Sequence, residues 1–120
     1  MSYMQVMKVE IFQILSDQTR MRALVLMAEA GALCVCELAH ALDIAQPKVS
    51  RHMAGLRKSC IVTSRRDAQW VFYSINGDMP EWQKTIVEAA IEGNRNCVQA
   101  TRDRARLQDM KDRPDRCEVA

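Results

Sequence analysis

Two cysteines separated by a single residue, Cys34 and Cys36, are the part of this chain best suited to chemistry. Thiolate sulfur is a preferred ligand of soft metals and metalloids, and neighbouring thiols also take part in disulfide exchange. Within one α-helix the two side chains would point about 200° apart, since each residue turns the helix by roughly 100°. They can hold one ion together only if the start of the helix unwinds or is already irregular. We therefore expect a switch in which ion binding distorts this helix.

The spacing of the remaining cysteines leaves the third ligand of such a site open. Cys97 lies on an apolar helical stripe, where a buried structural thiol is the alternative interpretation. Cys117 lies in a charged C-terminal tail that could fold back, and a small cellular thiol could serve as well. Cys60 is expected to be structural.

The residues after the cysteine pair are typical of a helix-turn-helix. Residues 35–42 predict a short helix, residues 43–45 a tight turn, and a second helix begins at Gln46 with Pro47 in its first turn. Val49, Met53 and Leu56 form the predicted buried face of that second helix. The polar side chains left outside lie near the end that enters the major groove in such motifs: Gln46, Lys48, Ser50, Arg51 and His52.

A β-hairpin with a basic tip is predicted next, with strands over 61–64 and 70–75 and a polar loop over 65–69. Residues 43–70 carry six Lys or Arg and two Asp, a local excess of positive charge that suits a phosphate-binding surface. The predicted phosphate contacts are Lys48, Arg51, Arg57, Arg65 and Arg66. Gln46, Ser50 and His52 are the predicted readers of base edges, and Gln69 is added as a hairpin contact to DNA.

Amphipathic helices are predicted to flank this unit. One covers residues 3–15, a second runs from the Ser16-Asp17 cap to Gly31, and a third starts at Pro80 and continues through Val98. The first and last of these are expected to form a two-fold dimer interface. The fold class is thus mainly α with a small β-hairpin. We expect one domain over residues 1–100 and a charged, disordered tail over 101–120.

Composition excludes several function classes. The longest apolar run, residues 23–28, is too short to cross a bilayer, and no N-terminal stretch resembles a signal peptide. Together with five cysteines, an odd number, this favours a reducing cytoplasm and no membrane partner. No paired carboxylates, Ser/His/Asp set or Gly-rich phosphate loop supports an enzyme, and a small thiol–disulfide redox protein is the remaining alternative of that kind.

Over roughly residues 10–95 the chain resembles the ArsR family of winged-helix metalloregulatory repressors, and within it the arsenical and antimonial sensors. The motifs that carry the resemblance are Leu33-Cys34-Val35-Cys36-Glu37-Leu38, Gln46-Pro47-Lys48-Val49-Ser50-Arg51-His52 and Gln69-Trp70-Val71-Phe72-Tyr73.

The resemblance implies a winged helix-turn-helix homodimer on an inverted-repeat operator of double-stranded DNA. No cofactor is required for DNA binding, and arsenic(III) or antimony(III) acts as the inducer by binding Cys34 and Cys36. Ala39 stands where the family pattern has a third cysteine, and Ala68 stands where the wing turn usually has glycine. A repressor selective for methylarsenite and a thiol-redox-sensing repressor of the same fold are the alternatives.

Overall fold

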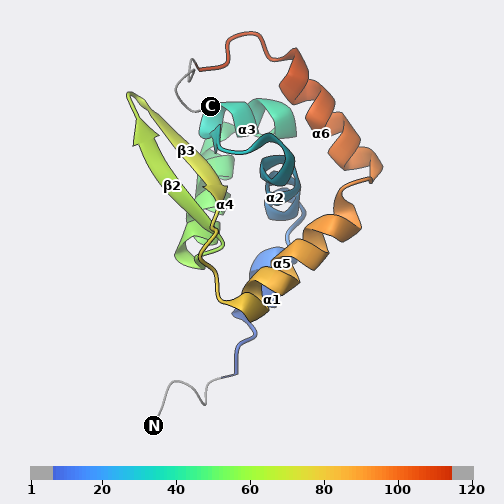
Figure 1. Ribbon diagram of the computed structural model, residues 1–120. Coiled ribbons are helices and arrows are strands. Elements are labelled where there is room, and N and C mark those ends of the chain that lie inside the picture. Colours follow the sequence, from blue (N-terminus) through green and yellow to red (C-terminus); the bar gives the residue numbers. More distant parts are fainter. Residues whose placement is uncertain (1–6, 115–120) are drawn as a thin grey trace.

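The computed structural model describes residues 7–114 of the 120-residue chain, and within that range the chain forms six helices and three strands (Figure 1). In chain order they are α1 (Glu10–Leu15), α2 (Gln18–Ala30), β1 (Leu33–Cys34), α3 (Val35–Leu42), α4 (Gln46–Lys58), β2 (Val62–Asp67), β3 (Trp70–Ile75), α5 (Glu81–Asn94) and α6 (Val98–Asp109). The predicted fold class, mainly α with a small β-hairpin, is confirmed.

Helices α2, α3 and α4 enclose the core. α2 begins where the Asp17 carboxylate accepts the Arg20 backbone N–H at 2.9 Å, and it ends at Gly31, whose φ of 82° suits glycine. Both predicted caps are confirmed, as are the bounds of α3 and the start of α4. Asp43 turns the chain between these two helices with a left-handed φ of 57°. Fully buried side chains from the three helices include Leu24, Leu38, Leu42, Val49, Met53 and Leu56.

The sheet is antiparallel in the order β1-β3-β2. The predicted hairpin is confirmed, but its loop is shorter than expected because Asp67 pairs with Trp70 and leaves only Ala68 and Gln69 in the turn. Ala68 takes a φ of 57°, a left-handed value that glycine adopts more readily than alanine. The six-pair ladder between β2 and β3 outweighs the local strain of about 1–2 kcal/mol. Strand β1, which the sequence did not predict, pairs Cys34 with Phe72.

The N-terminal helix is shorter than predicted. α1 begins at Glu10 instead of near residue 3, and residues 7–9 are not helical. Residues 1–6 lie outside the described part of the chain. Met7 and Val9 are exposed among the described residues, so burial does not offset the low helix propensity of valine.

The C-terminal region differs most from the prediction. α5 ends at Asn94, and α6 begins after Cys97, whose Sγ accepts the Ala100 backbone N–H at 3.4 Å. One long helix through Val98 is therefore wrong, because Gly93 and Asn94 are weak helix formers and Cys97 caps a new helix. The expected disorder is also wrong for residues 101–109, which lie within α6 and pack on α2 and α3. Residues 115–120 lie outside the described range.

No helix within residues 7–114 is long and apolar enough to cross a membrane.

Candidate metal centre and nucleic-acid interface

The cysteine pair sits at the junction between β1 and α3. Cys34 ends the strand and precedes the helix with extended backbone angles, φ −85° and ψ 168°. Because Cys34 is outside the helix, the 200° separation expected for two helical residues does not apply, and its Sγ lies 2.8 Å from the Sγ of Cys36. Of the two possibilities raised by the sequence, the helix start is thus already irregular. Cys34 is buried, Cys36 is half-buried, and both are free thiols.

Glu37 fixes the backbone beside the pair. Its Oε1 accepts the Cys34 N–H at 2.9 Å, while the Glu37 N–H faces the Cys34 sulfur in a capping box. The Glu37 side chain is fully buried, and its Oε2 accepts the Nε–H of Arg113 at 2.6 Å. A buried carboxylate of this kind is stable only when it is paired and hydrogen-bonded. Hydrogen bonds through Glu37 therefore connect the backbone of the cysteine pair to Arg113, a residue 76 positions beyond Glu37.

Burial raises the pKa of the Cys34 thiol to about 12. The hydrogen bond with Cys36 acts in the same direction, and the Glu37 backbone N–H opposes it. Cys34 is therefore a protonated thiol at neutral pH. A ligand that binds its sulfur must displace that proton.

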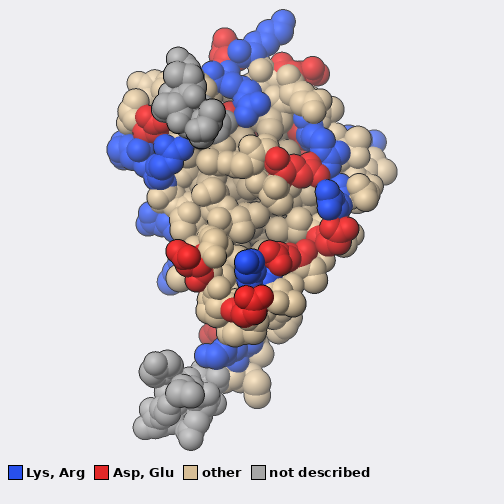
Figure 2. Space-filling view, in the orientation of Figure 1, with Lys and Arg blue, Asp and Glu red and all other residues tan. Residues whose placement is uncertain are grey.

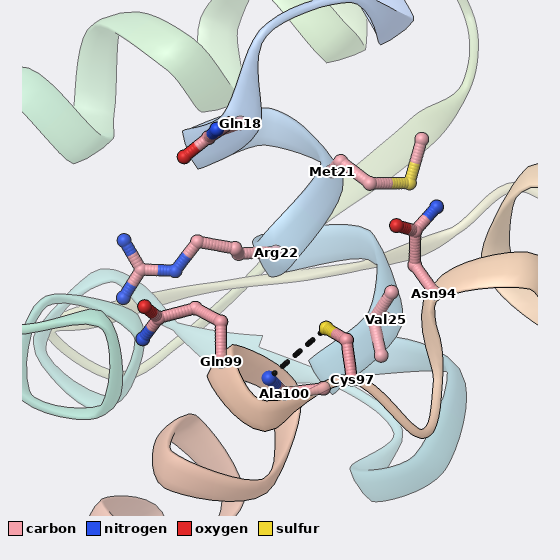
Figure 3. Close-up of a pocket in the computed structure, with 8 residues that line it drawn as sticks. All are labelled: Gln18, Met21, Arg22, Val25, Asn94, Cys97, Gln99 and Ala100. Carbon is pink, nitrogen blue, oxygen red and sulfur yellow. Dashed lines mark hydrogen bonds between the residues drawn. The ribbon is translucent and has the colours of Figure 1, made fainter.

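No third ligand joins the pair within residues 7–114, where no group of three or more His, Cys, Asp or Glu side chains is placed to hold a metal ion. Cys97 lies at the start of α6 and lines a cavity of about 220 Å³ with Met21 and Arg22 (Figure 3). The hydrogen bond from α6 to the end of α3 is made by Arg106, nine residues after Cys97 and about 13 Å further along the helix. Cys97 therefore does not join the pair within residues 7–114 of one chain, and its role as a third ligand stays a prediction. Cys117 lies outside the described residues.

The helix-turn-helix presents its predicted DNA contacts to solvent with one exception. The basic residues of the hairpin belong to β2. Figure 2 shows Lys and Arg gathered at the left edge, over the hairpin. Acidic side chains predominate along α5 in the same view. Arg65 lies 5.3 Å from the ring centroid of Phe72 and 3.6 Å from Asp67. The predicted contacts that are exposed are Gln46, Lys48, Ser50, Arg51, Arg57, Arg65, Arg66 and Gln69.

His52 is the exception: it does not point outward as expected, and its contact with DNA stays a prediction. Its ring faces α2, where Nδ1 lies 3.1 Å from the Arg20 guanidinium and 3.8 Å from the Asp17 carboxylate, and its side chain is only 17% exposed. The sequence contains a signal for this partial burial of His52. The residue follows buried Val49 by three positions and so borders the apolar stripe of α4. His52 joins the reading helix to the start of α2.

Comparison with known proteins identifies the family. The model for "Bacterial regulatory protein, arsR family" matches residues 17–64. The arsenic resistance transcriptional regulator ArsR2 of Pseudomonas putida is 43% identical over 111 residues, covering 92% of this chain and 94% of the relative. The chain belongs to the arsR family. The arsenical resistance operon repressor of Escherichia coli is 41% identical over 92 residues, 77% of this chain and 79% of that protein.

Solved structures of arsR-type regulators share the fold. The AntR antimony-specific transcriptional repressor matches with a TM-score of 0.58 and 28% identity over 69% of this chain and 72% of that one. Reduced HlyU from Vibrio cholerae matches with a TM-score of 0.60 and 27% identity over 72% of this chain and 86% of that one. As a member of the arsR family, the protein is a DNA-binding transcriptional regulator, and its relatives are regulators and not enzymes.

The sequence analysis missed the roles of three residues near the site, which are Glu37, Arg113 and Asp103. Glu37 has a sequence signal, since Cys34-x-x-Glu37 has the spacing of a capping box with cysteine in place of serine. Arg113 has none, because it contacts Glu37 across 76 positions of the chain. The same holds for Asp103 of α6, which pairs with Arg22 of α2 across 81 positions.

Proposed function

We propose that this arsR-family protein is an arsenic(III)- and antimony(III)-responsive repressor. It binds its operator as an apo homodimer and leaves DNA when the metalloid binds the sulfurs of Cys34 and Cys36. The observation that supports this most directly is the 2.8 Å separation of the two sulfurs at the first residues of the helix-turn-helix. The names of its relatives, which concern arsenic resistance, point to the same inducer class.

Exposed apolar side chains support the homodimer. Phe12 of α1 is 57% exposed and Trp82 of α5 is 42% exposed, and Met7 and Val9 add to the apolar surface beside α1. Large apolar side chains exposed together on flanking helices indicate a surface that a second copy covers. A dimer presents two α4 helices, which suits an inverted-repeat operator.

The geometry of the pair suggests how binding alters the DNA-binding shape. A metalloid bound by both sulfurs would lie between them, so the two sulfurs would have to move apart from their 2.8 Å separation. Cys34 is buried and belongs to both the sheet and the α3 cap, so this displacement acts on α3, which packs against α4. No unwinding of α3 is needed.

Release of the protein from its own promoter fragment tests the proposal. We expect arsenite and antimonite to release the wild type and the Cys60→Ser control, and to fail with Cys34→Ser and Cys36→Ser. Methylarsenite, which takes two thiols, distinguishes the methylarsenite-selective alternative: release by it alone would favour that alternative. Unchanged induction in both single variants would remove the cysteine pair as the sensor.

A second set of variants distinguishes contacts to DNA phosphates from contacts to base edges. Arg65→Ala removes a phosphate contact, so we expect weaker binding to all sequences and a flatter salt dependence. Gln46→Ala removes a base contact and should relax sequence preference instead. Equal loss on operator and random DNA for Gln46→Ala would count against its assignment.

A thiol-redox-sensing repressor is the second candidate, because sulfurs 2.8 Å apart are also placed to form a disulfide. In that reaction a peroxide accepts two electrons, the two thiol protons leave in water, and one S–S bond forms. The raised pKa of Cys34 disfavours it, since the thiolate is the reactive form. Release by peroxide with no response to arsenite would support the redox function.

A further inference from the structure

Arg20, in the first turn of α2, contacts two other helices. Its Nε–H donates to the Ile14 carbonyl at 2.6 Å, and one of its Nη–H groups donates to the Gln13 carbonyl at 3.2 Å. Both carbonyls belong to the last turn of α1, where a helix leaves its oxygens without partners of its own. The other Nη lies 3.1 Å from Nδ1 of His52 in α4. One guanidinium group thus joins α1 to the helix that carries the predicted base contacts.

The contact between Arg20 and His52 has a defined direction. Arginine can only donate, so Nδ1 of His52 accepts and the ring carries its proton on Nε2. The Asp17 carboxylate accepts the Arg20 backbone N–H at 2.9 Å and lies 3.8 Å from the same Nδ1. The start of α2 therefore holds the histidine ring from two sides.

An apolar contact between α1 and α4 accompanies these hydrogen bonds. Gly55 of α4 lies against Ile14, since a Cβ added at this glycine would be 3.4 Å from the Ile14 Cδ1. Apolar attraction has no preferred direction, whereas a hydrogen bond weakens steeply as its angle changes. Packing at Gly55 therefore holds the two helices together, and the bonds of Arg20 fix their relative orientation.

We propose that Arg20 is a positioning residue that sets the separation of DNA half-sites the protein accepts, by fixing α4 against α1. This inference rests on the proposed function, in which α1 contributes exposed Phe12 to the dimer surface and two α4 helices bind an inverted repeat. In such a dimer the separation of the two α4 helices depends on how each is held against its own α1. One base pair inserted between the half-sites moves them about 3.4 Å further apart and turns one by about 35°. A fixed joint cannot follow that change.

The experiment measures Kd on fragments of the promoter in which one base pair is inserted between the half-sites of the operator. The spacing ratio is the Kd on the lengthened site divided by the Kd on the native site. We expect Arg20→Gln to lower the wild-type ratio about tenfold, the smaller effect typical of a hydrogen bond to a charged group. The loss of affinity should fall on the native site, because only there does the joint hold both α4 helices in place.

Two substitutions of His52 separate this role from damage to the fold. His52→Leu removes the acceptor and leaves Arg20 bonded to α1, so it should lower the spacing ratio as Arg20→Gln does. His52→Asn retains an acceptor oxygen close to the position of Nδ1, so its spacing ratio should stay near that of the wild type. A contact of His52 with DNA would change Kd on both sites by the same factor and leave the ratio unaltered.

Arg104→Gln is the matched control. Its guanidinium also joins two segments, through the Glu29 carboxylate at 2.6 Å and the Arg95 carbonyl at 3.0 Å, and its removal should leave the spacing ratio unchanged. A wild-type ratio in Arg20→Gln or in His52→Leu would overturn the proposal, even if affinity fell equally on both sites. Failure of the proposed function is a separate result: a wild-type protein that binds both sites equally is not a dimer fixed on an inverted repeat, and this inference falls with it.

Discussion

The protonated state of Cys34 predicts that the affinity for a divalent cation depends on pH, whereas the affinity for arsenous acid does not. Its pKa of about 12 lies well above neutral pH, so the thiol carries its proton across the range from about pH 6.5 to about pH 8.5. A divalent cation such as cadmium must expel that proton into solution. Its affinity therefore rises at least tenfold per pH unit, or about a hundredfold over this range, from Cys34 alone. Arsenous acid is neutral and removes the thiol proton as water, so its affinity should stay constant.

Direct binding to the protein without DNA gives the cleanest measurement, because operator affinity has a pH dependence of its own. Titrations with cadmium and with arsenite, followed by the ultraviolet absorbance of the newly formed sulfur bonds, would be run at three pH values in this range. Cys60→Ser should reproduce the wild type, since that thiol lies outside the pair. A cadmium affinity that changes by less than tenfold per unit, or an arsenite affinity that follows cadmium, would refute the reasoning.

Three further predictions concern stability and assembly. The pKa of Cys34 is raised above its unfolded value of 9.0, so its contribution to the free energy of unfolding is fully present below pH 9. That contribution falls by about 1.4 kcal/mol per pH unit as the pH rises toward 12. Urea unfolding should show this loss in the wild type and not in Cys34→Ser. Asp103→Asn breaks a buried ion pair and should lower the free energy of unfolding by about 3–5 kcal/mol, whereas exposed Asp109→Asn should change it little. Phe12→Glu places charge on the proposed dimer surface, and sedimentation should show a shift toward monomer; an unchanged dimer would exclude α1 from the interface.

Local patterns were sufficient to predict the helix-turn-helix and the hairpin. Asp17, Gly31 and Pro47 act within one or two turns of their own position, and the apolar spacing of Val49, Met53 and Leu56 identifies the buried face of α4 directly. These signals depend only on neighbouring residues. The corresponding elements therefore agree with the prediction to within a few residues.

Contacts between distant parts of the chain could not be predicted in this way. The charged residues after Ala100 looked like a solvated tail because their partners, Arg22 and Glu37, lie more than seventy positions away. The sequence also left open whether the start of α3 is irregular: pairing with β3 holds Cys34 in extended conformation, and no helical periodicity reveals that. In both cases tertiary contacts decided what local patterns could not.

Under the proposed function, the same contacts would couple the cysteine pair to the DNA-binding helix. A roughly hundredfold loss of operator affinity on inducer binding requires a coupling free energy of about 2.7 kcal/mol between the inducer and DNA. The hydrogen bond from the Cys34 N–H to the Glu37 carboxylate is of a kind worth about 1.5–3 kcal/mol, which is the size of coupling required. Because α3 carries the cysteine pair at one end and the turn into α4 at the other, no longer relay is needed. By linkage, operator DNA must weaken inducer binding by the same factor as the inducer weakens DNA binding.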